Sequence, residues 1–416
     1  MPSWDVFVAF DEEDVLAGRL YSQRRRGRES ATFTYDSSYL ERQDAYALDP
    51  QLPLTLGPLH TQEGVPLFRA FGDSSPDRWG QHLIRQAEEQ QARARSATPA
   101  TLGEIDFLVR VRDDLRQGNL RFREAGGEAF LAAGDAPVPP QTELVRLLAA
   151  AGRAEEELAS FDELALLIQA GGSSLGGARP KAHVIDADGR IAIAKFPSAR
   201  FDAWNVMAWE KVALDLAERA GITVPESQLI EIAGRRVLII QRFDRRDGKR
   251  IGFASAMTML EANDHDQKSY LEIAEVIEEQ SPEATRDLHE LWRRIAFTVL
   301  ISNTDDHLRN HGFVRRSAGW ALSPAYDLNP NPEPGAKRLQ TAITEADPTP
   351  SIANLIEVAP YFRLDPEDAA ATLGEVREAT SHWRDLAETY SLGRDEIRRF
   401  ENAFETAEAA AATAYS

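Results

Sequence analysis

The sequence predicts an α+β fold with two lobes and an additional N-terminal α/β subdomain. Strand-like alternation of apolar residues with turn signals occupies the middle of the chain, whereas apolar runs of helical spacing dominate after residue 246. Consecutive prolines at 135–140 mark a linker, since proline breaks both helices and strands. We therefore expect three regions: residues 1–135 as the N-terminal subdomain, 136–245 as a small lobe and 246–416 as a mainly helical large lobe.

The N-terminal region is predicted to begin with strands and to continue as helix. Residues 6–10, 19–23 and 31–35 have strand-like patterns, and residues 77–95 have helical periodicity. The basic run Arg24–Arg28 falls at the tip of the hairpin between the second and third strands. Such a tip is usually solvated, so a contact with phosphate or with a partner stays open as the alternative.

A candidate phosphate-binding loop lies in the middle of the chain. Residues 171–181, Gly-Gly-Ser-Ser-Leu-Gly-Gly-Ala-Arg-Pro-Lys, are rich in glycine and hydroxyl groups, and glycines let backbone amides approach phosphate oxygens. The segment is neither a Walker A loop nor the Gly-x-Gly-x-x-Gly of kinases, so a flexible surface loop is the alternative. Two strands follow, 181–185 and 190–196, and Lys195 lies at the end of the second.

A helix at 206–217 and a strand at 236–241 continue this region. Glu210 on the helix is placed to pair with Lys195, although a solvated helix face explains it equally well. The strand is followed by the polar residues Gln241 and Arg242 and then by Phe243, which we interpret as a hinge between two lobes. The hinge backbone could form hydrogen bonds to adenine, and the Phe243 side chain could pack against the adenine ring. A buried strand followed by a loop is the alternative.

The stretch Asn303–Asn310, Asn-Thr-Asp-Asp-His-Leu-Arg-Asn, follows an apolar helical run and carries the strongest chemical signal. It places Asp305 five residues before Asn310. Protein kinases use this Asp-x-x-x-x-Asn spacing: the Asp accepts the proton of the attacking hydroxyl, and the Asn holds a magnesium ion. Residues 311–322 have the pattern of a β-hairpin that would return Asp327 to Asn310, where two oxygen ligands can share a cation. The sequence therefore predicts phosphoryl transfer.

Other interpretations of these polar residues stay open. Asp, Asn and His are common in loops and helix caps, and each alone is more often solvated than catalytic. Asp305, Asp306, His307 and His311 could instead form a metal-hydrolase cluster, which usually needs further ligands at a recognisable spacing. The other histidines considered stand alone in the sequence: His183, His265 and His289.

The motifs resemble those of the HipA-family serine/threonine kinases, which are the toxins of bacterial type II toxin–antitoxin modules. They follow the order of that family over most of the chain. The N-terminal motifs are Phe-Gly-Asp-Ser-Ser-Pro-Asp-Arg-Trp-Gly at 71–80 and Gly-Asn-Leu-Arg-Phe at 118–122. The later motifs are Ser-Leu-Gly-Gly-Ala-Arg-Pro-Lys at 174–181, Lys-Phe-Pro from Lys195, Gln-Arg-Phe-Asp-Arg at 241–245, the stretch Asn303–Asn310 and Ala-Tyr-Asp at 325–327.

The resemblance implies a bilobal protein-kinase-like fold and a serine/threonine protein kinase that uses ATP and Mg²⁺. It implies that Asp305 is the proton acceptor, that Asn310 and Asp327 are Mg²⁺ ligands and that Lys195 contacts the ATP phosphates. Ser174 matches the loop serine that such kinases phosphorylate on themselves, which shuts activity down. The predicted nucleotide-binding residues are Ser174, Leu175, Gly176, Gly177, Ala178, Arg179, Lys181, Lys195, Gln241, Arg242, Phe243, His307, Asn310 and Asp327.

The resemblance also implies partners. The antitoxin of such a module is a small HipB-like helix-turn-helix protein that binds operator DNA together with the toxin, so the toxin reaches DNA only indirectly. Known targets in the family are aminoacyl-tRNA synthetases, whose modification arrests growth. Two other functions remain as alternatives: a small-molecule phosphotransferase, and a catalytically weak co-repressor that acts through the antitoxin.

Composition limits the function classes. The 416 residues suffice for two or three domains, and the absence of cysteine excludes disulfides and thiolate metal sites. A net charge of −20 argues against a chain that grips DNA over a broad surface by itself. The start of the chain lacks the basic and apolar segments of a signal peptide, and no apolar stretch is long enough to span a membrane. We expect a cytoplasmic protein.

Overall fold

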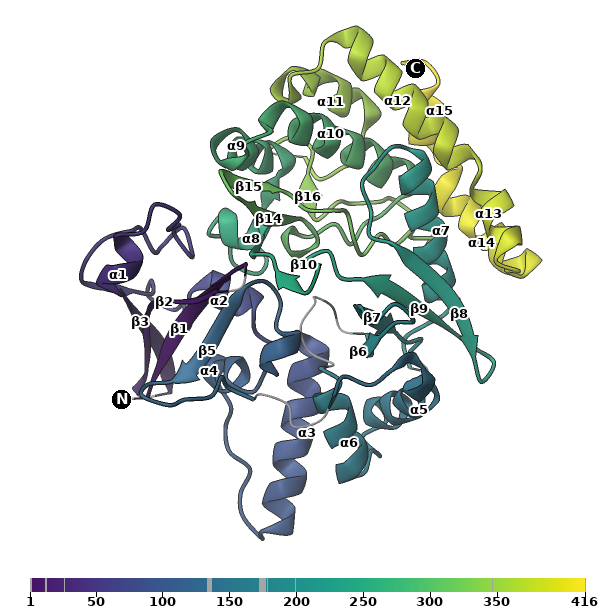
Figure 1. The fold of residues 1–416 in the computed structure, drawn as a ribbon. Coiled ribbons are helices and arrows are strands. Elements are labelled where there is room, and N and C mark those ends of the chain that lie inside the picture. Colours follow the sequence, from purple (N-terminus) through teal and green to yellow (C-terminus); the bar gives the residue numbers. More distant parts are fainter. Residues whose placement is uncertain are drawn as a thin grey trace. The chain divides into compact units, whose positions relative to one another are not determined.

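The chain folds as an α+β protein that divides into two compact units (Figure 1). The computed structural model describes residues 2–11, 13–25, 27–132, 137–171, 177, 179–198, 200–345 and 347–415. The first unit comprises Met1–Phe201, Ile232–Arg235 and Asp244–Ala254; the second comprises Asp202–Glu231, Arg236–Phe243 and Ser255–Ser416. The division into subdomains 1–135, 136–245 and 246–416 stays a prediction, as does the arrangement in two lobes.

The first unit opens with an antiparallel sheet, which confirms the predicted strands at the start of the chain. Its strand order is β4-β3-β2-β1-β5. Burial alternates along β3, where Ala31, Phe33 and Tyr35 face the core, as a sheet with one covered face requires. Phe33 and Phe71 pack edge to face with ring centroids 5.7 Å apart. The strands are β1 (Ser3–Phe10), β2 (Glu13–Arg25), β3 (Arg28–Tyr35), β4 (Pro58–His60) and β5 (Leu120–Glu124).

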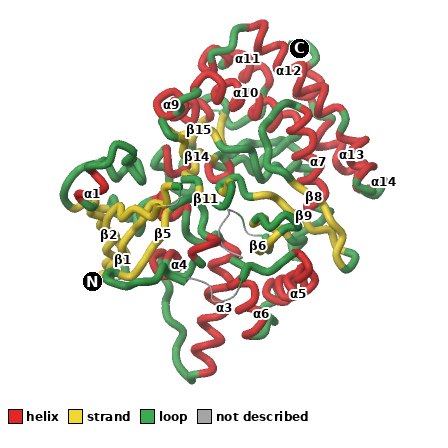
Figure 2. Tube along the Cα trace, viewed as in Figure 1, coloured by secondary structure: helices red, strands yellow, loops and turns green. Residues whose placement is uncertain are grey.

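Helices of the first unit lie between the strands of this sheet along the chain and after β5 (Figure 2). The helix predicted at 77–95 is confirmed as α3, and its first turn is capped by Asp77, whose Oδ1 accepts a hydrogen bond from Gly80 N at 2.8 Å. Two further helices, α5 and α6, come later in the first unit. The helices of the first unit are α1 (Ser37–Leu40), α2 (Arg69–Asp73), α3 (Arg78–Ala94), α4 (Glu104–Leu108), α5 (Leu144–Glu155) and α6 (Phe161–Gln169), with the 3-10 turns η1 (Asp113–Leu115) and η2 (Gln141–Glu143).

A β-hairpin follows in the first unit, and it confirms the two predicted strands. β6 (Lys181–Ile185) pairs antiparallel with β7 (Ile191–Lys195), and the turn is held by the Asp186 carboxylate, which accepts from Arg190 N at 2.8 Å. The described part of the predicted linker, residues 137–140, packs against this hairpin: Pro139 O accepts from Ile185 N at 2.9 Å. A proline carbonyl can still accept such a bond, so the prolines lie beside the strand and do not form a free connector.

Two short strands, β10 (Arg245–Arg246) and β11 (Lys249–Arg250), also belong to the first unit, and β12 (Phe253–Ser255) crosses the boundary between the units. The second unit starts with α7 (Val206–Arg219), the helix predicted at 206–217. β8 (Ser227–Ile232) and β9 (Arg235–Gln241) then run side by side, with their end residues Ile232 and Arg235 assigned to the first unit.

The rest of the second unit is built largely from helices (Figure 2). The predicted apolar stripe of α10 is buried, with Leu291, Trp292 and Ile295 among its core residues. Trp209 of α7 stacks on Phe400 at 3.5 Å between ring centroids. The helices are α8 (Ala256–Met259), α9 (Tyr270–Gln280), α10 (Ala284–Leu300), α11 (Ile352–Glu357), α12 (Pro366–Ser381), α13 (Trp383–Thr389), α14 (Arg394–Phe404) and α15 (Ala407–Ala412), with η3 (Leu308–Asn310) and η4 (Ala359–Phe362).

Four short strands of the second unit lie among these helices. The predicted hairpin after the Asn303–Asn310 stretch is confirmed as β14 (Gly312–Arg316) and β15 (Gly319–Leu322), which pair antiparallel. β13 (Lys268–Ser269) and β16 (Thr341–Ala342) pair in parallel. In the described part of the chain, no helix combines the length and the apolar character needed to cross a membrane.

Candidate functional site

The loop Asn303–Asn310 is fixed at its root by the end of α10. Ser302 adopts a left-handed backbone with φ 52°, and its Oγ donates to Ala403 O at 2.8 Å. Asn303 N then donates back to Thr298 O at 2.9 Å, which satisfies a carbonyl of the last helical turn. Asn303 is buried, and its Oδ1 accepts from Asp305 N. The helix end therefore sets the starting direction of the loop.

The loop brings Asp305 and Asn310 together, as their spacing predicted. Asn310 Nδ2 donates to Asp305 O at 2.7 Å, and Asn310 N donates to His307 O within the η3 turn. Asn310 is buried, whereas 56% of the Asp305 side chain is exposed. Because the amide nitrogen of Asn310 is bonded to this carbonyl, its Oδ1 is directed elsewhere and is suited to bind a hard cation.

The neighbouring Asp306 is a buried anchor that the motif analysis did not assign. Its Oδ2 accepts from Tyr270 Oη at 2.8 Å, and its Oδ1 accepts from Gln340 N at 2.8 Å. Its backbone oxygen accepts from Thr341 Oγ1 at 2.6 Å. Burial raises the pKa of Asp306 to about 6, against the effect of these hydrogen bonds. Two adjacent aspartates in the sequence indicate that one carboxylate is buried. The partners of Asp306, Tyr270 and Gln340, are too distant along the chain to be predicted from the sequence.

The two histidines of the loop region differ in their surroundings. His307 is partly exposed, and its Nε2 lies 4.0 Å from Asp305 Oδ1. His311 is buried, packs edge to face on Tyr270 at 5.2 Å, and lies with its Nε2 3.3 Å from Asp306 O. Burial lowers the pKa of His311 to about 3, so its ring is neutral. Among the described residues, no three His, Asp or Glu side chains are grouped as metal ligands.

The hairpin β14–β15 returns the chain to the loop. Tyr326 Oη donates to Arg309 O at 2.7 Å, which places the Ala-Tyr-Asp motif beside the residue that precedes Asn310. Asp327 itself has a left-handed backbone with φ 57°, and Asn329 Nδ2 donates to its Oδ1 at 3.3 Å. A non-glycine residue in this conformation is strained, and such strain collects at functional sites. The structure thus brings together the stretches that carry Asn310 and Asp327.

The predicted hinge residues end β9 in the second unit. Gln241 N donates to Glu226 O at 2.9 Å, and Arg242 is buried. The ring of Phe243 lies 5.6 Å from that of Tyr326, with 31° between the ring planes. Phe243 therefore lies next to the Ala-Tyr-Asp motif. Its predicted contact with adenine stays a prediction.

The remaining predicted residues belong to the first unit. Lys195 ends β7 and is half-buried. Lys181, its partner across the hairpin, is buried and forms an ion pair with Asp77, with Nζ and Oδ2 2.6 Å apart. Its backbone oxygen accepts from Trp79 Nε1 at 3.1 Å. Gly177 has φ 120°, and a Cβ added to it would lie 3.2 Å from Lys181 Nζ.

Six residues of the predicted phosphate-binding loop lie outside the described residues: Gly172, Ser173, Ser174, Leu175, Gly176 and Ala178. Arg179 is described and partly buried. Glu210 on α7 is buried in the second unit, while Lys195 belongs to the first. Their pairing stays a prediction.

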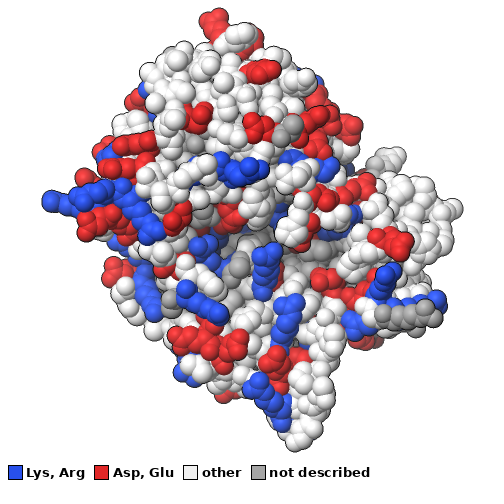
Figure 3. Space-filling view, turned by 180° about the vertical axis from the view of Figure 1, so that it is seen from behind, with Lys and Arg blue, Asp and Glu red and all other residues white. Residues whose placement is uncertain are grey.

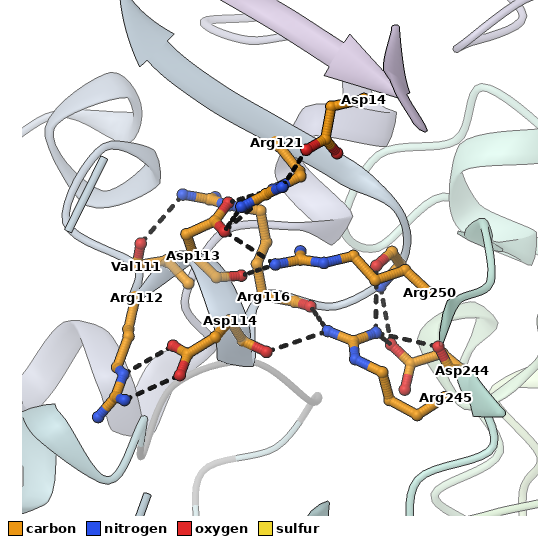
Figure 4. Close-up of polar contacts among 11 residues, drawn as sticks. Asp14, Val111, Arg112, Asp113, Asp114, Arg116, Arg121, Asp244, Arg245 and Arg250 are labelled. Carbon is orange, nitrogen blue, oxygen red and sulfur yellow. Dashed lines mark hydrogen bonds and ion pairs between the residues drawn. The ribbon is translucent and has the colours of Figure 1, made fainter. Parts of the chain in front are cut away.

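The last two residues of the Gln-Arg-Phe-Asp-Arg motif have a separate role within the first unit (Figure 4). Asp244 Oδ2 accepts from Gly118 N at 2.8 Å and from Arg245 Nη1 at 2.9 Å. Arg245 Nη2 donates to Arg116 O at 2.6 Å. Asp244 and Arg245 thus form hydrogen bonds to the backbone of Gly118, the first residue of the Gly-Asn-Leu-Arg-Phe motif. These contacts explain two family motifs that the sequence analysis had left without a function.

A second set of contacts extends this group. Asp113 Oδ2 accepts from Arg121 Nη2 at 2.6 Å and from Arg250 Nη2 at 2.9 Å, and Arg121 also pairs with Asp14 (Figure 4). We call Asp113, Arg121, Asp244, Arg245 and Arg250 the arginine–aspartate clasp. Each of its carboxylates is buried and faces at least one guanidinium.

The surface charge is mixed. Acidic and basic side chains are interspersed over the face that Figure 3 shows, in keeping with the net charge of −20. At the basic hairpin tip, the Arg24 guanidinium pairs with Glu29 at 2.6 Å and with Asp106 at 3.1 Å, and Arg28 pairs with Glu63. These two arginines of the tip are therefore engaged with carboxylates of the same unit.

The fold and the loop define an α+β protein with a kinase-type Asp-x-x-x-x-Asn loop. The chain belongs to the HipA family: the profile of the HipA-like C-terminal domain matches residues 173–383, and that of the HipA N-terminal domain matches residues 11–105. This confirms the resemblance seen in the motifs. The predicted hinge residues and the loop Asn303–Asn310 fall within the C-terminal match, and the glycine-rich segment does so from residue 173 onward.

Curated relatives are named as kinases. "Putative kinase Y4dM" of Sinorhizobium fredii is 31% identical over 154 residues, which cover 33% of this chain and 36% of that protein. "Putative kinase" of Haemophilus influenzae is 27% identical over 143 residues, 30% of this chain and 42% of the relative. Both matches span less than half of the relative's length. "Putative kinase Y4mE" of S. fredii is 25% identical over 338 residues, 75% of each chain.

A solved structure shares the fold. A chain of the Shewanella oneidensis MR-1 toxin–antitoxin complex of HipA, HipB and operator DNA superposes with a TM-score of 0.64. The match covers 98% of this chain and 96% of that chain at 15% sequence identity. At this identity the likeness establishes the fold alone.

Proposed function

We propose that this protein is an ATP-dependent serine/threonine protein kinase. The observation that carries the proposal is the loop geometry of the second unit, where Asn310 bonds the backbone of Asp305 and Tyr326 ties the Asp327 segment to Arg309. An exposed carboxylate beside a buried amide and a strained second carboxylate fits the kinase arrangement. Membership of the HipA family and the kinase names of the relatives support the same reaction class.

In this proposal Asp305 accepts the proton of the attacking serine or threonine hydroxyl as the hydroxyl oxygen bonds to the γ-phosphorus of ATP. The bond between that phosphorus and the bridging oxygen of the β-phosphate breaks, and ADP leaves. Asn310 and Asp327 offer oxygen ligands to Mg²⁺, which neutralises charge on the phosphates when bound. Lys195 neutralises further phosphate charge, and the backbone of residues 174–179 surrounds the phosphates with amide groups. Gln241, Arg242 and Phe243 face the base. Lys181 and His307 complete the proposed nucleotide contacts, although the Lys181 ammonium is already paired with Asp77.

We further propose that the kinase is the toxin of a toxin–antitoxin module with a HipB-like helix-turn-helix partner. The structural neighbour comes from a complex of HipA with HipB and operator DNA, which supports a partner of this kind. This chain would then reach DNA through the antitoxin, consistent with its own net charge of −20. A translation component such as an aminoacyl-tRNA synthetase is the proposed target, and phosphorylation of Ser174 is the proposed off-switch, since a phosphate there would repel the nucleotide.

The experiment is to incubate the purified chain with radiolabelled ATP and Mg²⁺, with casein as an added acceptor, and to map the phosphorylated residues. We expect label on Ser174 and on casein in the wild type and on neither in Asp305→Asn. Equal labelling by Asp305→Asn would refute the proposed proton acceptor. Label on casein without label on Ser174 would refute only the off-switch.

A further inference from the structure

Gln340 contacts both aspartates of the loop at once. Its backbone nitrogen donates to Asp306 Oδ1 at 2.8 Å, and its side-chain Nε2 donates to Asp305 Oδ1 at 2.9 Å. The two contacts come from one residue 34 and 35 positions further along the chain. The buried carboxylate therefore holds the backbone of Gln340, while the amide of the same residue holds the exposed carboxylate.

The backbone around Gln340 is held from several directions. Thr341 Oγ1 donates to Asp306 O at 2.6 Å, and β16 pairs with β13 through Thr341 and Lys268. Leu339, on the other side of Gln340, is buried and its N donates to Pro348 O at 2.8 Å. Because both neighbours are fixed, only the side-chain torsions of Gln340 remain to be ordered when it reaches Asp305.

Asp306 is held on its other carboxylate oxygen by Tyr270, a buried residue of α9. Tyr270 directly follows β13 and donates its hydroxyl to Asp306 Oδ2 at 2.8 Å. Tyr270 is fully buried, and burial raises its pKa well above the ordinary value, so the hydroxyl keeps its proton and remains a donor. Asp306 is thus held by neutral donors on both oxygens, and it presents a fixed acceptor to the backbone of Gln340.

We propose that Gln340 is a positioning residue that orients the Asp305 carboxylate, with Asp306 and Tyr270 as its buried support. The inference rests on the proposed function, because it assigns Gln340 a part in that reaction. More than half of the Asp305 side chain is exposed, so its carboxylate can rotate among several staggered conformations. A donor on Oδ1 favours one of them. Proton acceptance in the transition state requires the carboxylate within hydrogen-bond reach of the acceptor hydroxyl, so orientation affects the rate directly.

The test compares Gln340→Glu with a matched control, Gln228→Glu. Gln340→Glu keeps the shape and the backbone bond to Asp306 but replaces the amide donor with an acceptor. Gln228 is an exposed residue of β8 in the same unit, so the control makes the same change in charge. We would measure kcat and KM for ATP with casein as acceptor, binding of a non-hydrolysable ATP analogue with Mg²⁺, and the melting temperature. A second variant, Gln340→Leu, removes the donor without adding charge.

We expect kcat to fall by about tenfold or more in Gln340→Glu and by a smaller factor in Gln340→Leu, because misorientation of a catalytic base slows the chemical step. KM for ATP, binding of the analogue and the melting temperature should stay within about twofold or a few degrees of the wild type. Gln228→Glu should match the wild type in all measurements.

Three results would contradict the inference. A wild-type kcat in both Gln340 variants would show that Asp305 needs no orientation from this residue. A loss of analogue binding equal to the loss of kcat would assign Gln340 to the nucleotide instead. A melting temperature low enough to explain the lost activity would show that Gln340 stabilises the fold and does not orient Asp305. By contrast, a wild-type chain that transfers no phosphate would overturn the proposed function itself.

Discussion

The arginine–aspartate clasp of the first unit and the loop Asn303–Asn310 of the second hold their carboxylates in opposite ways. In the clasp, Asp113 and Asp244 are buried against guanidinium groups. In the loop, buried Asp306 is held by a phenol and a backbone amide, and exposed Asp305 by a glutamine amide. A buried carboxylate paired with arginine serves the fold, whereas exposed Asp305, held by a neutral donor, keeps the negative charge that the proposed proton transfer needs.

The largest expected effect of a substitution is at Asp327. Asp327→Asn should reduce phosphoryl transfer from ATP by at least about a thousandfold, because in the proposed function Asp327 supplies a negatively charged oxygen to Mg²⁺ and an amide lacks that charge. Its melting temperature should remain that of the wild type, since Asp327 is only half-buried. Transfer of radiolabel and thermal melting measure the two quantities. Asp347→Asn, at an exposed position, is the control, and equal activities of the two variants would remove Asp327 from the site.

The two lysines of the β6–β7 hairpin extend the comparison. Lys195→Ala should raise KM for ATP by at least about tenfold with little change in stability. Lys181→Ala should instead lower the free energy of unfolding by about 3 kcal/mol, because it leaves the Asp77 carboxylate buried without its ammonium. Denaturant unfolding and ATP titration separate the two effects. Equal increases in KM would show that the phosphate lysine is wrongly assigned.

Within the clasp, Asp113→Ala should lower the free energy of unfolding by about 3 kcal/mol, since Arg121 and Arg250 both lose their shared partner. Asp14→Ala is the matched control, because Asp14 also pairs with Arg121 but is a third exposed. We expect a loss of about 0.5 kcal/mol there. Urea denaturation of both variants would measure the difference, and similar losses would mean that the clasp is no more than a surface ion pair.

The smallest expected effect concerns Asp306, whose substitution should change how the free energy of unfolding depends on pH. Burial raises the pKa of this group to about 6, above the value of about 3.9 in an unfolded chain. Between these values the folded state binds a proton that the unfolded state has released, so this group lowers stability as pH rises through the window. Asp306→Asn should lack this slope, with a difference from the wild type of about 2 kcal/mol between the two ends. Denaturant unfolding at several pH values would detect this difference, with Asp395→Asn at an exposed position as the control. If the free energy of unfolding of Asp306→Asn depended on pH as it does in the wild type, Asp306 would not have the raised pKa.

Most of the local structure could be predicted from the sequence. The apolar stripe of α10, the β14–β15 hairpin and the β6–β7 hairpin follow from periodicity and turn residues, which act between near neighbours. The contact between Asp305 and Asn310 was equally accessible, because the two residues are five positions apart on one loop. The predicted linker at 135–140 was the exception: its described part lies beside β6, since a proline carbonyl still accepts a hydrogen bond.

The sequence by itself determined the order of elements, the family motifs and the residues that the proposed chemistry needs. Only the tertiary structure decided which polar residues support them. Tyr270 and Gln340 reach the loop from 36 and 35 positions away, Asp77 reaches Lys181 across 104, and Asp113 reaches Arg250 across 137. Such partners leave no periodic pattern, because a side chain pairs across the core according to how the elements pack and not according to its distance along the chain.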